Sequence, residues 1–422
     1  MIWNKIKIIF RDSGLRKKLF FVFLVLVLFR LGANIPIPGV DSRQLSNFLT
    51  GNSFFGMMNL FSGGGLSNLS VFMLGVGPFI TATIVMQLLT MIFPRLKEIY
   101  QEEGEAGRQK FEQYSRILTI PLAFLQGFGL LTLLEHKNVL MNLTFFGHLT
   151  NIVIVVAGSM LLMWLGELIT EYGVGNGISL LIFAGIIAGA PSALGKFLIT
   201  FDISLLPSYI LILAVSFFIL VGVVFVTEAE RPIPVSYAKQ VRGNKVYGGV
   251  STHLPLRVNQ AGVIPLIFAI SILLFPQMIA GFLSTSGNFF AQFAVRGLSF
   301  FTQQHLFIYG STYFLLVFFF TYFYTNVTFD PEAISTNLQK SGAFVPGIRP
   351  GRSSAEYLSK VLTRITLVGS LFLGAIAVLP MIIEVATGIG FAIGGTALLI
   401  VVSVVLETIK EVESQVVMRE YE

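Results

Sequence analysis

The sequence predicts an all-α polytopic membrane protein with ten transmembrane helices. Of the 422 residues, 54% are hydrophobic and only 12% are charged, which is about half the charged fraction of a soluble protein. The apolar residues also gather in long runs, and a helix needs roughly 20 mostly apolar residues to cross a bilayer. Low charge and long apolar runs together define this class.

Ten apolar runs are the predicted spans. They cover residues 19–32, 69–93, 117–134, 152–168, 178–194, 205–226, 263–283, 306–324, 365–383 and 392–406. No cleavable signal peptide is expected, because the first run lacks a small-residue cleavage pattern. In the fifth run, Gly185 and Gly189 form a small-xxx-small pattern, which predicts that this helix packs closely against another.

Lysines and arginines predict the direction of the spans, because they gather on the cytoplasmic side of membrane proteins. The N-terminal tail, the connections at 94–116, 227–261 and 326–364, and the C-terminal tail hold 23 of the 28. The opposite side has four, and Arg30 falls inside the first run, close enough to its outer end to extend to the interface. Both termini are therefore predicted to be cytoplasmic.

Ten spans with both ends on one side divide into two sets of five. Because five is odd, two homologous halves, residues 1–200 and 201–422, would be inverted relative to one another. Inverted halves often enclose a path across the membrane at their interface. The residues show no convincing internal repeat, so this symmetry is a hypothesis from parity alone.

Several kinds of chemistry find no support in the residues. The chain has no cysteine and its four histidines are scattered, so no metal site and no cofactor is predicted. The stretch GAPSALGKF is not a phosphate-binding loop, because Phe197 stands where serine or threonine is required. Glu167 and Glu384 lie near the ends of spans, so no pair of carboxylates is deep in the membrane. This argues against an ion-coupled transporter.

Two cytoplasmic connections are long and contain shaped basic turns. The first alternates around RGNK, which predicts a hairpin with Gly243 and Asn244 at the turn and with Arg242 and Lys245 at the tip. The second contains VPGIRPGR, in which prolines and glycines stiffen a turn carrying Arg349 and Arg352. The residues alone leave two interpretations open: plain positively charged loops, or a docking surface for RNA phosphates or an acidic protein face.

Isoleucines recur four apart on two of the predicted spans. Ile80 and Ile84 share one helical face, and so do Ile182 and Ile186. Such pairs most often face lipid or a neighbouring helix. A short, half-apolar stretch interrupted by Gly63, Gly64 and Gly65 precedes the second span, which is unusual for a loop.

Six motifs, in order along essentially the whole chain, resemble the bacterial SecY family, the channel of the general protein-secretion translocon. They read FRLGANIPIPG, LFSGGGLSNLSVFMLGVGPFITATIVMQLL, YGVGNGISLLIFAGI, VYGGVSTHLPLRVNQAGVIP, FDPEAISTNLQKSGAFVPGIRPGRSS and GGTALLIVV. The resemblance implies two halves around a central hourglass pore. It implies a passive channel in the cytoplasmic membrane of a bacterium, with no enzymatic activity of its own.

The resemblance also assigns a plug and a pore ring. The plug is implied to be a short re-entrant helix at about residues 55–67. Its residues are Met57, Leu60 and Phe61, which face the closed channel, and Gly63, Gly64 and Gly65, which form a hinge. The ring consists of Ile80, Ile84, Ile182, Ile186, Ile267 and Ile400. Aliphatic side chains exclude water at rest and fit loosely around any polypeptide.

A lateral gate and docking sites follow from the same resemblance. The second and seventh spans, beside the third and eighth, are implied to open towards lipid, and Pro265 and Pro276 are expected to weaken the seventh helix. Arg242, Lys245, Arg349 and Arg352 are implied to contact the SecA motor ATPase or the ribosome. The other implied partners are SecE, SecG, preproteins with signal sequences and membrane lipid. A small-solute transporter and an insertase that secretes nothing are the alternatives.

Overall fold

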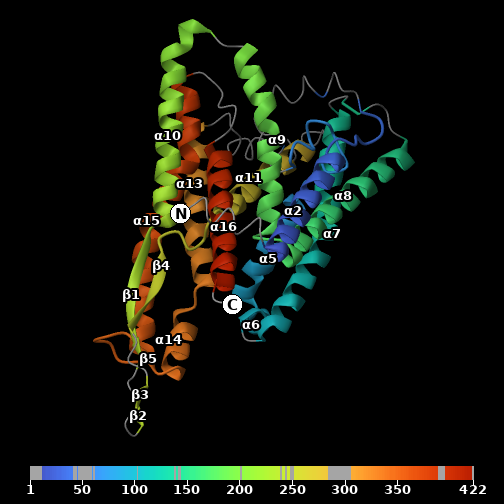
Figure 1. The fold of residues 1–422 in the computed structure, drawn as a ribbon. Helices are drawn as coiled ribbons and strands as arrows, with labels where there is room; N and C mark the ends of the chain where they lie inside the picture. Colours follow the sequence, from blue (N-terminus) through green and yellow to red (C-terminus); the bar gives the residue numbers. More distant parts are fainter. Residues whose placement is uncertain are drawn as a thin grey trace. The chain divides into compact units, whose positions relative to one another are not determined.

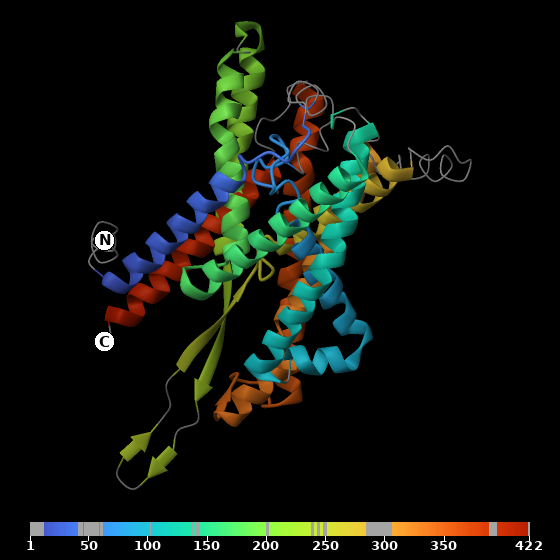
Figure 2. The ribbon, with the colours of Figure 1, turned by 90° about the vertical axis from the view of Figure 1, so that its right-hand side faces the viewer.

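The structure is a computed structural model that describes residues 12–40, 45, 59, 62–101, 103–136, 139–140, 144–199, 202–237, 240–242, 245–247, 251–283, 306–387 and 395–420. The chain forms two compact units. The first consists of Met1–Leu205, Ile270–Tyr309 and Ala392–Glu422, and the second of Leu206–Ala269 and Gly310–Phe391. Figures 1 and 2 show the ribbon from two sides.

A helix lies in each of the ten predicted runs, which confirms those helices. They are α2 (Ser13–Gly32), α5 (Gly77–Ile92), α7 (Gly104–His136), α8 (Phe145–Tyr172), α9 (Gly177–Ile199), α10 (Leu206–Glu228), α11 (Ile264–Leu283), α13 (Leu306–Thr328), α15 (Arg352–Thr387) and α16 (Gly395–Glu420). Two short helices, α6 (Pro94–Gln101) and α14 (Pro331–Lys340), and a one-turn 3-10 helix, η1 (Ile203–Leu205), lie between them.

The number of spans stays a prediction. By length and composition, five described stretches are long and apolar enough to cross a membrane: Gly104–Glu135, Phe145–Tyr172, Ile203–Glu228, Phe307–Lys340 and Arg352–Ile383. The pair Gly77–Ile92 and Pro94–Tyr100 would add a sixth, but it is bent by 117°. The inverted halves also stay a prediction. The unit boundary at Leu205 lies close to residue 200, yet two segments of the second half group with the first.

The second predicted run begins as turns and not as a helix. We expected the span to start at residue 69, but α5 starts only at Gly77. The backbone before it visits the left-handed region at Gly63, Gly64, Leu69 and Gly75, and a right-handed helix cannot pass through such residues. The run is therefore a turn segment followed by a 16-residue helix.

The first unit is built around α7, which packs against α5, α6 and α8, while α8 packs against α9 and α2. Its core is apolar and includes Leu69, Met73, Leu131 and Val155, all fully buried. Helix α9 packs on α16 as well as on α8 and α2. Helices from opposite ends of the sequence, α9 (Gly177–Ile199) and α16 (Gly395–Glu420), thus lie side by side.

The start of α9 packs closely against the backbone of α8. A Cβ on Gly177 would lie 1.9 Å from the carbonyl oxygen of Gly166 in α8, so only glycine fits there. The amide of Gly177 donates to the hydroxyl of Thr170, over 2.9 Å. No described atom lies within 4 Å of a Cβ built on Gly189, while Gly185 is buried, so close packing at the Gly185 and Gly189 pattern stays a prediction.

The second unit combines helices with a small antiparallel sheet in the order β4-β1-β5. Strand β1 (Glu230–Tyr237) pairs with β4 (Ser251–Arg257) along its length, and β5 (Ala343–Phe344) pairs with the end of β1. Ile233, Leu256, Val345 and Leu358 form the buried core beneath the sheet. Helix α14 packs on α15 and against β5, and α10 packs on α15.

A hairpin of β2 (Gln240–Arg242) and β3 (Lys245–Tyr247) lies between β1 and β4 in the chain. Figure 2 shows it beyond the end of the β1–β4 ribbon. Arg242 pairs directly with Lys245, which leaves two residues for the turn. The predicted hairpin and its basic tip are confirmed, while Gly243 and Asn244 lie outside the described residues.

Candidate functional site

The six isoleucines singled out by the sequence are all buried. They are between 1% and 7% exposed: Ile80, Ile84, Ile182, Ile186, Ile267 and Ile400. Five of them belong to the first unit, on α5, α9 and α16. Because α9 packs on α16, the helices that carry Ile182, Ile186 and Ile400 are neighbours.

Burial separates these isoleucines from side chains that face outward. On α10, Phe217, Phe218 and Phe225 are 61–74% exposed, as expected of helix faces that meet lipid acyl chains. The isoleucine pairs on α5 and α9 therefore face protein, so contact with lipid is wrong, while ordinary packing against a neighbouring helix stays open beside the pore ring. Whether the six side chains form one ring stays a prediction, since Ile267 belongs to the second unit.

Helix α11 carries Ile267 near its first turn and packs on α13 through aromatic contacts. The ring of Phe268 meets the rings of Phe320 and Tyr324 edge to face, with centroids 5.9 Å and 6.1 Å apart. The expectation that Pro265 weakens this helix is wrong, because Pro265 is its second residue, where no backbone donor is needed. Pro276 lies inside the helix, where it removes one backbone donor.

The glycine segment before α5 forms tight turns that require glycine. Gly63 and Gly64 have φ angles of 66° and 82°, which L side chains rarely adopt. The amide of Gly64 donates to the carbonyl of Asn59 over 2.9 Å. The part of the predicted plug helix from Ser62 to Ser67 is thus a set of turns, while Met57, Leu60 and Phe61 lie outside the described residues.

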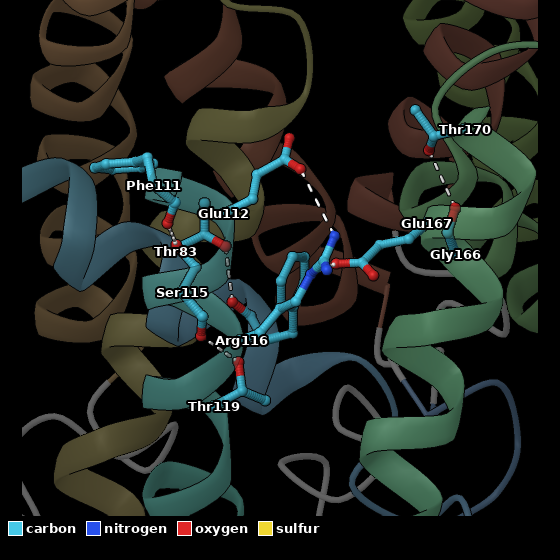
Figure 3. Close-up of polar contacts among 10 residues, drawn as sticks. Thr83, Phe111, Glu112, Ser115, Arg116, Thr119, Gly166, Glu167 and Thr170 are labelled. Carbon is cyan, nitrogen blue, oxygen red and sulfur yellow. Dashed lines mark hydrogen bonds and ion pairs between the residues drawn. The ribbon is translucent and has the colours of Figure 1, made fainter. Parts of the chain in front are cut away.

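A charged contact joins α7 to α8 (Figure 3). Arg116 Nε donates to Glu167 Oε1 over 2.7 Å, and its Nη2 lies 3.8 Å from Glu112. Around it, the hydroxyls of Ser115 and Thr119 donate to backbone carbonyls of α7. Sequence analysis placed Glu167 near the end of a span and missed this partner. The signal was a base directly before one predicted run and an acid near the end of the next run.

The second basic turn is exposed, and its backbone is tightly turned. Arg349 lies between Gly347 and Gly351, whose φ angles are 83° and 95°, and its carbonyl accepts a hydrogen bond from the Ser354 hydroxyl over 2.9 Å. The side chain of Arg352 is 93% exposed, with Glu356 at 3.4 Å on the same helix. For Arg242 and Lys245 in the β2–β3 hairpin, the structure describes the backbone alone.

The two basic turns belong to one structural unit, which sequence analysis missed. Strand β5 precedes the Arg349 turn in the chain, and it pairs with β1, which leads into the β2–β3 hairpin. The β4-β1-β5 sheet therefore links two segments that seemed to be independent loops. In the described part of the chain, no group of three or more His, Cys, Asp or Glu side chains is placed to hold a metal ion.

The apolar helices long enough to cross a bilayer, with charged turns gathered outside them, define a multi-span helical membrane protein. A sequence model of the SecY family matches residues 70–409. The protein translocase subunit SecY of Streptomyces galbus is 44% identical over 437 residues, covering 98% of this chain and 97% of the relative. That of Escherichia coli K12 is 44% identical over 423 residues, covering 97% and 93%. The chain belongs to the SecY family.

Solved structures share the fold. A structure described as a protein conducting channel gives a TM-score of 0.67 at 21% identity, covering 96% of this chain and 93% of that one. Sec61 in a canine ribosome-channel complex gives a TM-score of 0.62 at 20% identity, with the same coverage. At these identities the likeness establishes the arrangement of the helices and nothing finer.

Proposed function

We propose that the chain is a passive protein-conducting channel in the cytoplasmic membrane of a bacterium. It translocates unfolded preproteins and releases hydrophobic segments laterally into the bilayer. The burial of the paired isoleucines on α5 and α9, in a chain of the SecY family, is the observation that carries this proposal. Residues that served only to face lipid would be exposed, as those of α10 are.

The channel seal is a ring of six isoleucines where two inverted halves of five spans, residues 1–200 and 201–422, enclose an hourglass pore. A narrow aliphatic constriction excludes water and therefore ions. It offers no hydrogen-bonding group that would retain a particular substrate sequence. The plug at about residues 55–67 covers the ring at rest, with Gly63, Gly64 and Gly65 as its hinge.

The lateral gate lies between α5 and α11, beside α7 and α13. Two observations support this proposal. Phe268 packs on α13, so α11 and α13 meet at the level of Ile267. Helix α5 packs on α7, and α7 is joined to α8 by Arg116 and Glu167. On one side of the gate α5 is thus supported by α7, and on the other side α11 is supported by α13.

The driving force comes from partners. No nucleotide-binding motif occurs in the chain, so ATP hydrolysis is assigned to the SecA motor, or the elongating ribosome supplies the force. Arg242, Lys245, Arg349 and Arg352 form the docking surface, supported by the sheet that links both turns. Both termini are cytoplasmic, and SecE and SecG complete the complex.

Ion leak through reconstituted vesicles tests the pore ring. Ile84→Asn and Ile186→Asn each place an amide in the constriction, so the resting conductance should rise about tenfold, because a wetted constriction no longer excludes ions. Ile152→Asn is the matched control, since Ile152 is equally buried but lies in the α7–α8 core. It should lower stability without raising conductance. Equal conductance in all three variants would refute the ring.

Transport assays separate the channel from its alternatives. Vesicles with the chain and its partner subunits should import a signal-bearing preprotein only when SecA and ATP are added. Uptake of a labelled small solute by this chain alone would instead indicate a transporter. Membrane integration without any export of soluble preproteins would indicate an insertase.

A further inference from the structure

Arg30 makes a contact that its position in a span does not require. It lies in the last turn of α2, and its Nη1 donates to the carbonyl oxygen of Gly63 over 3.1 Å. An arginine near the end of a span needs only to reach the headgroups or water. Here the guanidinium is directed at the backbone of a turn 33 residues further along the chain.

The turn is shaped to lie against this end of α2. Gly63 and Gly64 have positive φ angles, and a Cβ on Gly63 would lie 2.1 Å from the ring of Phe29, the residue before Arg30. A Cβ on Gly64 would lie 3.3 Å from Arg30 Nη1. The glycines therefore allow the turn backbone to approach both side chains closely, and no larger residue fits at Gly63.

The chain on the far side of the turn is held by its backbone instead. The amide of Val71 donates to the Ile35 carbonyl over 3.0 Å, and the amide of Ile37 donates to the Leu69 carbonyl over 2.9 Å. These two hydrogen bonds flank an antiparallel β-bridge between Pro36 and Ser70. Within the described residues, the other backbone and side-chain hydrogen bonds of residues 62–65 have their partners between residues 59 and 70.

We propose that Arg30 is a positioning residue that holds the glycine turn in its closed arrangement and thereby sets how often the turn opens. A single hydrogen bond from a charged donor is strong enough to bias such an equilibrium and weak enough to be broken repeatedly. The backbone bonds at Leu69 and Val71 would keep the base of the turn fixed while residues 62–65 move. This role rests on the proposed function, in which that turn is the plug hinge.

The absence of cysteine from the chain makes a direct test available. Ser62 is 1% exposed, so Ser62→Cys places a single buried thiol beside Gly63. Ser115→Cys is the matched control, because Ser115 is 2% exposed in α7. The rate at which a polar maleimide labels each thiol in the full-length, detergent-solubilised chain reports opening at that site.

Arg30→Gln should raise the labelling rate of Cys at position 62 about fivefold, because Arg30 is exposed and solvent weakens its hydrogen bond. It should leave the labelling rate of Cys at position 115 unchanged. Arg30→Lys, which keeps a charged donor, should restore most of the slow rate. Arg16→Gln, which removes a charge from the other end of α2, should have no effect. An unchanged rate at position 62 overturns the proposal, and so does an equal rise at both positions, which would mean general destabilisation.

Ion leak in vesicles distinguishes the role of Arg30 in holding the turn from the role of the turn in sealing the channel. Arg30→Gln should raise the resting leak in parallel with labelling at position 62. If labelling rises and the leak does not, Arg30 still holds the turn, but the assignment of that turn to the channel seal fails.

Discussion

The contact between Arg116 and Glu167 offers a sharp test of how α7 and α8 are held together. One arginine faces two carboxylates with different geometry: Glu167 on α8 at 2.7 Å and Glu112 on its own helix at 3.8 Å (Figure 3). Glu167→Gln and Glu112→Gln remove the same charge from the same partner. The two substitutions therefore differ in the contact that is lost and in how far each carboxylate is exposed.

The coupling free energy of Arg116 with Glu167 is expected to be several times that of Arg116 with Glu112. A hydrogen bond to a charged group contributes about 1.5–3 kcal/mol when it is well shielded from water. The side chain of Arg116 is 41% exposed and that of Glu167 is 22% exposed, so solvent screening reduces the expected coupling to about 1–2 kcal/mol. Glu112 is 61% exposed and four residues away on the helix, where such pairs contribute about 0.3–0.5 kcal/mol.

A double-mutant cycle measures both couplings. The free energy of unfolding in mixed detergent micelles is determined for Arg116→Gln, for each glutamate variant and for both double variants. Glu167→Gln should cost clearly more than Glu112→Gln, and only the Arg116–Glu167 pair should be strongly coupled. Equal costs, or a coupling of Arg116 to Glu167 below about 0.3 kcal/mol, would show that the pair is a solvated surface contact and does not join the helices.

Three further predictions concern packing, docking and the seal. Gly177→Ala should lower the melting temperature, because its Cβ would lie 1.9 Å from the Gly166 carbonyl, whereas Gly189→Ala on the same helix meets no described atom and should be neutral or slightly stabilising. Arg349→Glu should reduce SecA-driven export in a vesicle assay at least tenfold at normal protein levels, since it reverses the charge of an exposed turn; a parallel fall in protein level would make the residue structural. Deletion of residues 55–67 should leave an assembled complex with raised ion leak, and loss of assembly would contradict a movable plug.

The helices were predictable because the bilayer itself fixes them. In a hydrocarbon solvent every backbone donor and acceptor must be satisfied within the segment, so a long apolar run has few alternatives to a helix. The β2–β3 hairpin was predictable for a similar local reason, the Gly243–Asn244 turn between alternating residues. These features depend on neighbours in the sequence and need no tertiary information.

Features that depend on distant partners were not predictable in this way. The pairing of β5 with β1 joins residues that are more than 100 positions apart, and two residues are too short to form a recognisable strand. A close approach of α9 to α8 occurs at Gly177, where the sequence shows only a helix start, while Gly189 of the small-xxx-small pattern has no described atom within 4 Å of its Cβ position. A glycine spacing indicates where a close approach is sterically allowed, and only the partner helix determines whether it occurs.

The isoleucines show why a site of this kind is hard to find by residue patterns in a membrane protein. In a soluble helix the buried face is apolar and the exposed face is polar, but next to lipid both faces are apolar, so Ile80 and Ile84 look the same whichever way they point.

A polar residue on the same face breaks this ambiguity. Gln87 lies three residues after Ile84 and seven after Ile80, and it is 7% exposed, with no hydrogen-bond partner for its side-chain oxygen among the described residues. An amide is costly in hydrocarbon, so a face that carries both isoleucine and glutamine is expected to meet protein or water. The signal was present in the run ITATIVMQ, and it points to the same helix face that the proposed pore ring uses.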